Sequence, residues 1–382
     1  MHPLCGADLA TLLALLRANR PLARAALPRV AVALLAALGR APMSGLERLM
    51  VAARRRALPP PEPPIFIVGH WRSGTTHLYN VLSRAPDLGY VSPVATGLPW
   101  DFLLLAPLIR PLLERQLPRE RFIDPIPVRP DSPQEDEIAL ANMGAPSFYH
   151  GLYFPARFFE HFARGTFFDG CGPEQIELWC RRHLYFMAKL ALQQPGKRLV
   201  IKNPVYSARV ALLRALSPGA KFIHIHRNPY LVYPSMRNFY AKLLQEFALQ
   251  DADPALDEFI LVTYARMLDR LLEDAATLPR GDFVELAFAD FEADTIGQLQ
   301  QVYERLGLDG FDAARPGFQA YLATLEPYPK RRYVAAPQER QLVERHCGRF
   351  LDRWGYGLPT ADGAPLEGPR AAPGPAAGCA GG

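Results

Sequence analysis

The sequence predicts an α/β protein with a mostly parallel sheet flanked by helices. Short runs of β-branched and aromatic residues, typical of strands buried on both faces, alternate with longer segments of helical periodicity. A glycine-bounded loop joins the first run to the helix after it, which is a further mark of such a sheet. The predicted strands cover residues 65–68, 199–201, 221–226 and 283–286. The clearest predicted helices cover residues 174–193, 207–216, 257–276 and 295–306.

Length and charge limit the possible functions. With 382 residues, of which 49% are hydrophobic, the chain is long enough for one large α/β domain or two average ones. The net charge of +5 suits a site for an anion but is too small for an extended nucleic-acid track, so no nucleic-acid partner is predicted. The five scattered cysteines include no C-x-x-C pair, which indicates free thiols in a reducing, cytoplasmic compartment and no metal site.

Residues 1–58 are predicted to form an N-terminal helical extension. Two apolar runs, at residues 9–16 and 30–38, are each shorter than the ~20 residues that a membrane span needs. Arginines separate the runs and no cleavable signal pattern follows them, so secretion is not expected. Two interpretations remain open: the helices pack on the main domain, or residues 9–38 form an amphipathic patch in peripheral contact with a membrane.

A proline-rich stretch marks the domain boundary. Residues 58–64 read LPPPEPP, which cannot form helix or interior strand. The main domain is therefore predicted at residues 62–357. From residue 362 onward the chain is rich in Gly, Pro and Ala, so residues 362–382 are predicted to be a disordered tail.

The loop after the first strand is predicted to bind a phosphate. Gly69 and Gly74 are separated by four residues, as in a P-loop, and backbone N–H groups would converge there with the start of a helix. Where a nucleoside triphosphatase carries its lysine this chain has Thr75, and a cation comes earlier instead, at Arg72. The predicted binding residues of the loop are Arg72, Ser73, Gly74, Thr75 and Thr76.

The run RSGTT after a buried strand resembles the 5′-phosphosulfate loop of sulfotransferases that use 3′-phosphoadenosine-5′-phosphosulfate (PAPS). Many members of that superfamily have lysine at the position of Arg72, whereas the protein-tyrosine sulfotransferases have arginine. The resemblance implies a P-loop-type fold, PAPS as co-substrate and no required metal. A generic glycine turn between strand and helix is the alternative.

Two further cations are predicted at the same edge of the sheet, where ligands of open α/β sheets bind. Arg227 follows the strand at 221–226, and Ser235 comes eight residues later; the pair resembles the 3′-phosphate site of these sulfotransferases. Lys202 follows the strand at 199–201 and resembles the lysine that acts at the sulfuryl group, although Asn203 stands where the tyrosine-modifying branch has aspartate. A solvated strand-end charge is the alternative for Lys202.

A basic cluster near the C-terminus, residues 328–333, resembles the segment that closes over the nucleotide in this superfamily. Lys330 is its favoured member, with an ordinary solvated charge run as the alternative.

The catalytic step implied by the resemblance is in-line displacement at sulfur, with Arg72 and Lys202 stabilising the developing charge. A general base must accept the acceptor's proton. The predicted candidates are the consecutive acids Glu135, Asp136 and Glu137, of which the first two are favoured, in a segment that resembles Pro-x-Glu-Asp-Glu-x-Ala-Leu of bacterial sulfotransferases; compensation of a helix dipole is the alternative. His70 and His150 are lesser candidates. Residues 90–96 contain no acid, which argues against protein-tyrosine substrates.

The acceptor is predicted only by class. Aromatic residues between 148 and 159 form either the wall of a pocket for a hydrophobic alcohol or lipid, or plain core. Two other functions remain open, a small-molecule kinase on a P-loop scaffold and a non-catalytic, membrane-associated nucleotide-binding protein. The sequence makes no prediction of oligomeric state.

Overall fold

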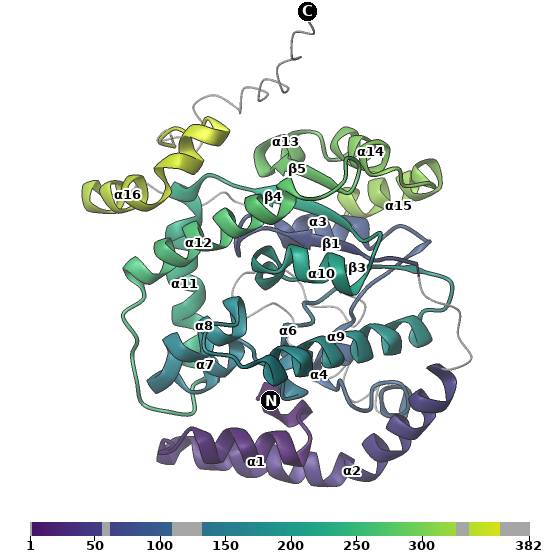
Figure 1. The fold of residues 1–382 in the computed structure, drawn as a ribbon, viewed down its shortest axis with the longest axis vertical. Coiled ribbons are helices and arrows are strands. Elements are labelled where there is room, and N and C mark those ends of the chain that lie inside the picture. The colour runs from purple at the N-terminus through teal and green to yellow at the C-terminus, as the bar shows by residue number, and fades with distance from the viewer. Residues whose placement is uncertain (1, 56–61, 109–131, 326–335, 360–382) are drawn as a thin grey trace, which may run out of the picture.

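A parallel five-stranded sheet forms the centre of the protein, which we describe from a computed structural model (Figure 1). The described residues are 2–55, 62–108, 132–325 and 336–359. The strand order is β2-β3-β1-β4-β5, and each neighbouring pair is parallel. The strands are β1 (Ile65–Val68), β2 (Leu88–Gly89), β3 (Arg198–Lys202), β4 (Lys221–His226) and β5 (Phe283–Ala287). The predicted α/β class is confirmed.

The position of the central strand β1 explains why the sequence of this strand is apolar throughout. All four residues of β1 are buried, because β1 pairs with β3 on one side and β4 on the other while helices cover both faces. Phe66 and Val68 belong to the larger of two hydrophobic clusters, and Ile65 and Ile67 belong to the smaller one. Alternate side chains of one strand therefore enter opposite layers, as the pleat of a strand requires.

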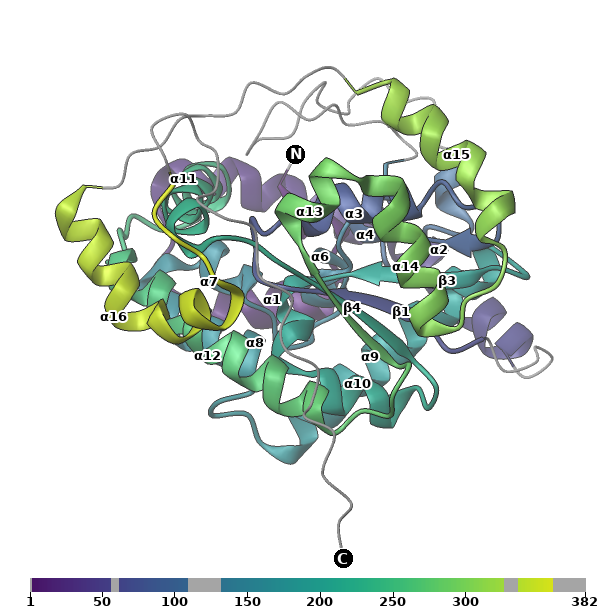
Figure 2. The same cartoon turned by 90° about the horizontal axis from the view of Figure 1, so that it is seen from above.

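Helices occupy most of the remaining chain, and Figure 2 shows them on both faces of the sheet. They are α1 (Leu9–Ala18), α2 (Leu27–Arg55), α3 (Thr75–Leu82), α4 (Pro93–Gly97), α6 (Glu137–Asn142), α7 (Tyr149–Tyr153), α8 (Phe158–Phe167), α9 (Pro173–Gln193), α10 (Val210–Leu216), α11 (Pro229–Phe247), α12 (Asp257–Ala276), α13 (Phe288–Ala293), α14 (Thr295–Leu306), α15 (Phe311–Ala323) and α16 (Pro337–Trp354). Short 3-10 turns are η1 (Pro3–Gly6), η2 (Arg24–Ala26), η3 (Pro155–Arg157) and η4 (Pro204–Ala208).

Predicted helix bounds are most accurate where the amphipathic pattern is long. The helices predicted at 257–276 and 295–306 are α12 and α14 with the same bounds. The helix predicted at 207–216 is wrong in its first turn, because the 3-10 turn η4 precedes α10 and Arg209, with φ −141°, interrupts the two. Strand β2 has two residues and was not predicted, since so short a strand has no detectable period.

The N-terminal helices pack on the rest of the protein and lie far from the sheet in the view of Figure 1. Their inner side chains, among them Leu12, Leu16 and Val30, belong to the larger hydrophobic cluster, so the helices pack on the main body, while contact of their outer faces with a membrane stays a prediction. The second apolar run is part of a 29-residue helix, α2. Residues 24–54 are therefore long and apolar enough to cross a membrane by length and composition, which corrects the expectation from the shorter run.

The boundaries at residues 58 and 62 stay predictions, and the predicted tail at 362–382 lies outside the described residues. Within the described part of the chain the cysteines are free thiols, at positions 5, 171, 180 and 347.

Candidate active site

Two glycines give the loop between β1 and α3 its shape. Gly69 and Gly74 have positive φ angles of 138° and 100°. A Cβ at position 69 would lie 2.4 Å from the carbonyl oxygen of Ile225, and a Cβ at position 74 would lie 2.1 Å from Cδ2 of Phe288. Any side chain at either position would therefore displace β4 or Phe288. Arg72 also lies in the left-handed region, with φ 68°.

Ser73 fixes the loop from inside. Its buried hydroxyl lies 2.7 Å from the carbonyl oxygen of His70 and 2.9 Å from that of Ile225 in β4. The hydroxyl therefore contacts the protein's own backbone, so the candidate anion donors of the loop are its main-chain N–H groups. The next helix, α3, begins at Thr75, and the first N–H groups of any helix have no intrahelical acceptor.

Arg72 and Ser235 meet at the carboxyl edge of the sheet. Nε of Arg72 donates a hydrogen bond of 2.9 Å to Oγ of Ser235 in α11. Arg227 directly follows β4, and its guanidinium carbon lies 4.7 Å from the ring centroid of Phe288, a cation–π distance. Phe288 begins α13 directly after β5 and also adjoins Gly74. The structure therefore brings both predicted phosphate anchors to one edge.

Lys202, the last residue of β3, reaches the start of α3. Its Nζ lies 3.3 Å from Oγ1 of Thr76 and forms an ion pair with Oε1 of Glu135. The side chain of Lys202 is 3% exposed and that of Glu135 is 17% exposed. In the sheet Lys202 lies beside Ile67 of β1, next to the point where the predicted phosphate loop starts. The lysine is therefore a buried, ion-paired group and not a solvated strand-end charge.

Asn203 joins the two acids that follow Glu135. Its Nδ2 lies 2.9 Å from Oδ1 of Asp136 and 2.9 Å from Oε2 of Glu137, so one amide group donates to both carboxyls. All three side chains are buried. An aspartate at position 203, as in the tyrosine-modifying branch, would bring a third carboxyl against the other two. Asparagine at position 203 therefore avoids the repulsion that a third carboxyl would cause beside Asp136 and Glu137.

Hydroxyl groups complete this buried network. Tyr206 donates a hydrogen bond to Asp136, and Ser147 donates one of 2.6 Å to Oε1 of Glu137. Burial raises the pKa of Asp136 to about 7 and also raises the pKa of Glu137. Of the three consecutive acids, only Glu137 lies in the first turn of α6, and only Glu135 contacts the lysine of β3.

The two histidines considered as bases lie in the core. His70 and His150 are buried, and burial lowers the pKa of each to about 4. The ring of His70 packs on Tyr264 with 4.7 Å between centroids, and Nε2 of His150 lies 3.2 Å from the carbonyl oxygen of Ala141. The aromatic residues between 148 and 159 are buried too, apart from the exposed Phe159. Plain core is therefore the better of the two interpretations for them.

The predicted site residues gather from four separated segments, and their roles stay predictions. They come from the loop, the end of β3, the end of β4 with α11 after it, and the segment before α6, while Lys330 lies outside the described residues. Phe288 and Tyr206 are not predicted from the sequence. Phe288 could have been found, because it follows a predicted strand at the same edge. Tyr206 could not, because its contact with Asp136 depends on tertiary packing.

The strand order, the loop after the central strand and the helix that starts from that loop define a P-loop-type α/β protein. A family model described as the sulfotransferase family matches residues 63–313. The chain belongs to the sulfotransferase family and is a sulfotransferase. The resemblance seen in the loop therefore extends over most of the predicted main domain.

Similar proteins agree with this family. The chain is 33% identical over 308 residues to the omega-hydroxy-beta-dihydromenaquinone-9 sulfotransferase Stf3 of Mycobacterium bovis and of Mycobacterium tuberculosis, covering 80% of this chain and 78% of each relative. The crystal structure of sulfotransferase STF1 from Mycobacterium tuberculosis matches with a TM-score of 0.59 and 19% identity, over 89% of this chain and 91% of that one. Sulfotransferase STF9 from Mycobacterium avium matches with a TM-score of 0.62 and 19% identity, over 83% and 84%. At this identity the two structures show the fold.

Proposed function

We propose that this enzyme transfers the sulfuryl group of PAPS to a hydroxyl group of a lipid-like acceptor. The observation that carries the proposal is the position of Lys202, whose Nζ contacts both Thr76 at the start of the phosphate-loop helix and the carboxylate of Glu135. A cation at this position can stabilise the leaving group held by the loop, and it lies beside a carboxylate that can accept the proton of the acceptor.

The donor would bind along the carboxyl edge of the sheet. The loop and the N-terminus of α3 suit the 5′-phosphosulfate, and Arg227 with Ser235 suits the 3′-phosphate. The hydrogen bond between Arg72 and Ser235 supports this assignment, because it means that the two anion sites are within reach of one arginine. Lys330, as a residue that closes over the nucleotide, remains part of the proposal on its resemblance alone.

The proposed reaction needs a base and a stabiliser of the leaving group. The acceptor oxygen attacks sulfur in line, the bond between sulfur and the bridging oxygen breaks, and adenosine 3′,5′-bisphosphate departs with the electron pair. Glu135 accepts the proton of the acceptor hydroxyl, since it is the partly exposed carboxylate beside Lys202. Arg72 and Lys202 stabilise the charge on the bridging oxygen. Asp136, which is buried in the Asn203 network, positions the acidic segment.

A lipid-like acceptor is supported by the Stf3 relatives, which match most of this chain and whose name gives a hydroxylated menaquinone as their acceptor. An acceptor of that kind is held in a membrane by its hydrophobic tail, so we include the predicted peripheral membrane contact of residues 9–38 in the proposal. The kinase alternative lacks support, because Thr75 stands where a triphosphate-binding loop carries its lysine.

Transfer of radioactive sulfate from ³⁵S-labelled PAPS tests the proposal. The acceptor probe is ω-hydroxy-β-dihydromenaquinone-9 in detergent micelles, and a short water-soluble alcohol is the control. We expect label in the organic extract with the quinone and far less with the short alcohol. Label with neither acceptor, from an enzyme that binds adenosine 3′,5′-bisphosphate, would favour the non-catalytic alternative. Transfer of phosphate from ATP would favour the kinase.

A further inference from the structure

Exposed apolar side chains gather on the outer face of α2. Six of the ten exposed large hydrophobic side chains among the described residues lie on this one helix, with exposed fractions between 50% and 72%. Neighbours on a helix face are three or four residues apart. Leu35, Leu38, Leu46 and Leu49 are separated by three, eight and three residues, so they lie on one side of the helix. We call this surface the outer stripe; it consists of Leu27, Val32, Leu35, Leu38, Leu46 and Leu49. Apolar surface of this extent marks an interaction site.

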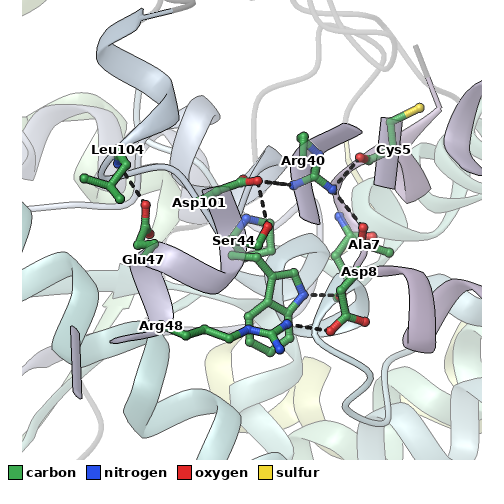
Figure 3. A network of polar contacts seen from close by, with 12 residues as sticks. Cys5, Ala7, Asp8, Arg40, Ser44, Glu47, Arg48, Asp101 and Leu104 are labelled. Atoms are coloured by element: carbon green, nitrogen blue, oxygen red, sulfur yellow. Dashed lines mark hydrogen bonds and ion pairs between the residues drawn. The ribbon is translucent and has the colours of Figure 1, made fainter. Parts of the chain in front are cut away.

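The inner face of α2 is fixed to the protein by polar contacts (Figure 3). Arg40 donates to both carboxylate oxygens of Asp101, at 2.9 and 2.7 Å, and Ser44 donates to the same carboxylate at 2.9 Å. Glu47 forms a fully buried ion pair of 2.5 Å with Lys189 of α9. These contacts orient the helix, so the outer stripe faces away from the core.

The exposed charged side chains of residues 9–54 have one sign. Within residues 9–54, all of which are described, every exposed side chain that is charged belongs to an arginine, and the remaining exposed residues are Ala, Val, Leu, Gly or Pro. The acids nearest in sequence are engaged with the protein, because Asp8 pairs with Arg48 and Glu47 pairs with Lys189. The exposed arginines are Arg17, Arg20, Arg24, Arg29 and Arg54, together with Arg48, whose charge is paired with Asp8. A surface meant for water normally carries both signs.

We propose that α2 docks on the surface of an anionic lipid membrane, with the outer stripe in the acyl boundary and the arginines at the headgroups. Exposed apolar side chains accompanied by exposed arginines are the chemistry that such a membrane recognises. A membrane span is disfavoured, since it would remove Arg40, Ser44 and Glu47 from their partners and expose them to hydrocarbon. A second copy is disfavoured as well, because two such faces would bring arginines together without exposed acids to pair them.

This inference deepens the membrane contact that the proposed function includes, but it is argued from the surface of α2 alone and needs neither donor nor acceptor. It replaces the predicted contact range of 9–38 with a defined face that extends to Leu49. The apolar row from Leu27 to Leu49 spans 22 residues, or about 33 Å of helix at 1.5 Å per residue. Side chains spread along this length can enter the same membrane surface only if the helix axis lies parallel to it. The predicted contact would therefore be interfacial.

Vesicle sedimentation of the full chain tests this inference. Vesicles of phosphatidylcholine alone are compared with vesicles that also contain phosphatidylglycerol. We expect the wild type to sediment with the anionic vesicles, and Leu35→Glu and Leu49→Glu to bind them at least about tenfold more weakly, because each places a charge in the acyl boundary. Val262→Glu, at an exposed apolar position of α12, is the matched control and should bind like the wild type.

Three results would overturn the inference. They are wild-type protein that stays in the supernatant with anionic vesicles, stripe variants that bind as tightly as the wild type, and a lipid-free dimer that Leu35→Glu dissociates in sedimentation velocity. The last result would assign the face to a second copy. Titration with adenosine 3′,5′-bisphosphate on the same variants should match the wild type, which separates the fate of this inference from that of the proposed function.

Discussion

Three consecutive acids, Glu135, Asp136 and Glu137, illustrate how much the surroundings of a residue decide its chemistry. The first pairs with Lys202 near the phosphate loop and keeps part of its surface in solvent. The other two turn inward and share the amide of Asn203. The sequence predicts a carboxylate base in this segment but cannot choose among the three, because the choice depends on which side chain faces β3.

Replacing Glu135 by glutamine should remove the base while keeping the shape of the site. We expect the rate of sulfuryl transfer at saturating acceptor to fall by about 10²-fold to 10⁴-fold, the usual contribution of general base catalysis. Binding of adenosine 3′,5′-bisphosphate should change little, and calorimetry checks this. Glu174→Gln, at an exposed position in the first turn of α9, is the control. A fully active Glu135→Gln enzyme would exclude Glu135 as the base.

Asp136 should influence stability through its raised pKa. Burial raises this pKa from 3.8 to about 7, so between about pH 4 and pH 7 the unfolded chain has released a proton that the folded chain still holds. The free energy of unfolding should therefore decrease as pH rises through this window. In Asp136→Asn this decrease should be smaller, as urea unfolding at several pH values would show.

The variant Asp136→Asn also distinguishes the function of Asp136 from that of Glu135. Asp136→Asn should keep most of its transfer activity, because the amide that replaces the carboxyl can still contact Asn203 and Tyr206. A loss of kcat as large as that of Glu135→Gln, in a variant that is fully folded, would mean that Asp136 takes part in the chemistry itself.

At the scale of elements, the sequence predicts those helices and strands whose side chains follow a regular hydrophobic pattern. The strands β1, β3, β4 and β5 are apolar runs, and α12 and α14 have long amphipathic patterns, so all are found. Two-residue β2 and the 3-10 turn η4 lack such a signal. The length of α2 is also missed, because Gly39, Pro42 and Gly45 interrupt its apolar run and only the contacts of its inner face explain why the helix continues.

The phosphate loop should tolerate no side chain at Gly74. In Gly74→Ala a Cβ would meet the ring of Phe288 at a backbone conformation with φ 100°, so we expect the free energy of unfolding to fall by roughly 1–3 kcal/mol or more. Binding of adenosine 3′,5′-bisphosphate should weaken as well. Gly348→Ala in α16, where a Cβ would meet nothing within 4 Å, should be neutral or stabilising by up to about 1 kcal/mol. Equal stability of the two variants would contradict the described loop conformation.

At the scale of the whole molecule, the fold class and the meeting of the candidate site residues at one sheet edge are predicted from the sequence, and the attachment of the N-terminal helices is not. Their polar contacts join residues far apart in the chain, such as Arg40 with Asp101 and Glu47 with Lys189. No local pattern encodes such pairs. The hydrophobic cluster shared by α1, α2 and the main body makes the predicted extension part of one core.

The ion pair of Glu47 with Lys189 tests whether the extension and the main body unfold together. Both side chains are fully buried, so Glu47→Ala should leave an uncompensated cation and lower the free energy of unfolding by about 3–5 kcal/mol. Urea unfolding should still show a single transition. Glu177→Ala, which removes an exposed pair with Arg181, should cost about 1 kcal/mol or less. If Glu47→Ala costs no more than this control, α2 contributes little to the stability of the main body.

The central claim is that the carboxyl edge of the sheet binds the nucleotide of PAPS, and calorimetric titration with adenosine 3′,5′-bisphosphate tests it most directly. We expect micromolar binding by the wild type, and binding about 10-fold to 100-fold weaker by Arg227→Ala, because a charge-assisted hydrogen bond to the 3′-phosphate is lost. Arg181→Ala, at an exposed position of α9, should bind like the wild type. A folded wild type that does not bind, or an Arg227→Ala variant that binds equally well, would contradict the account.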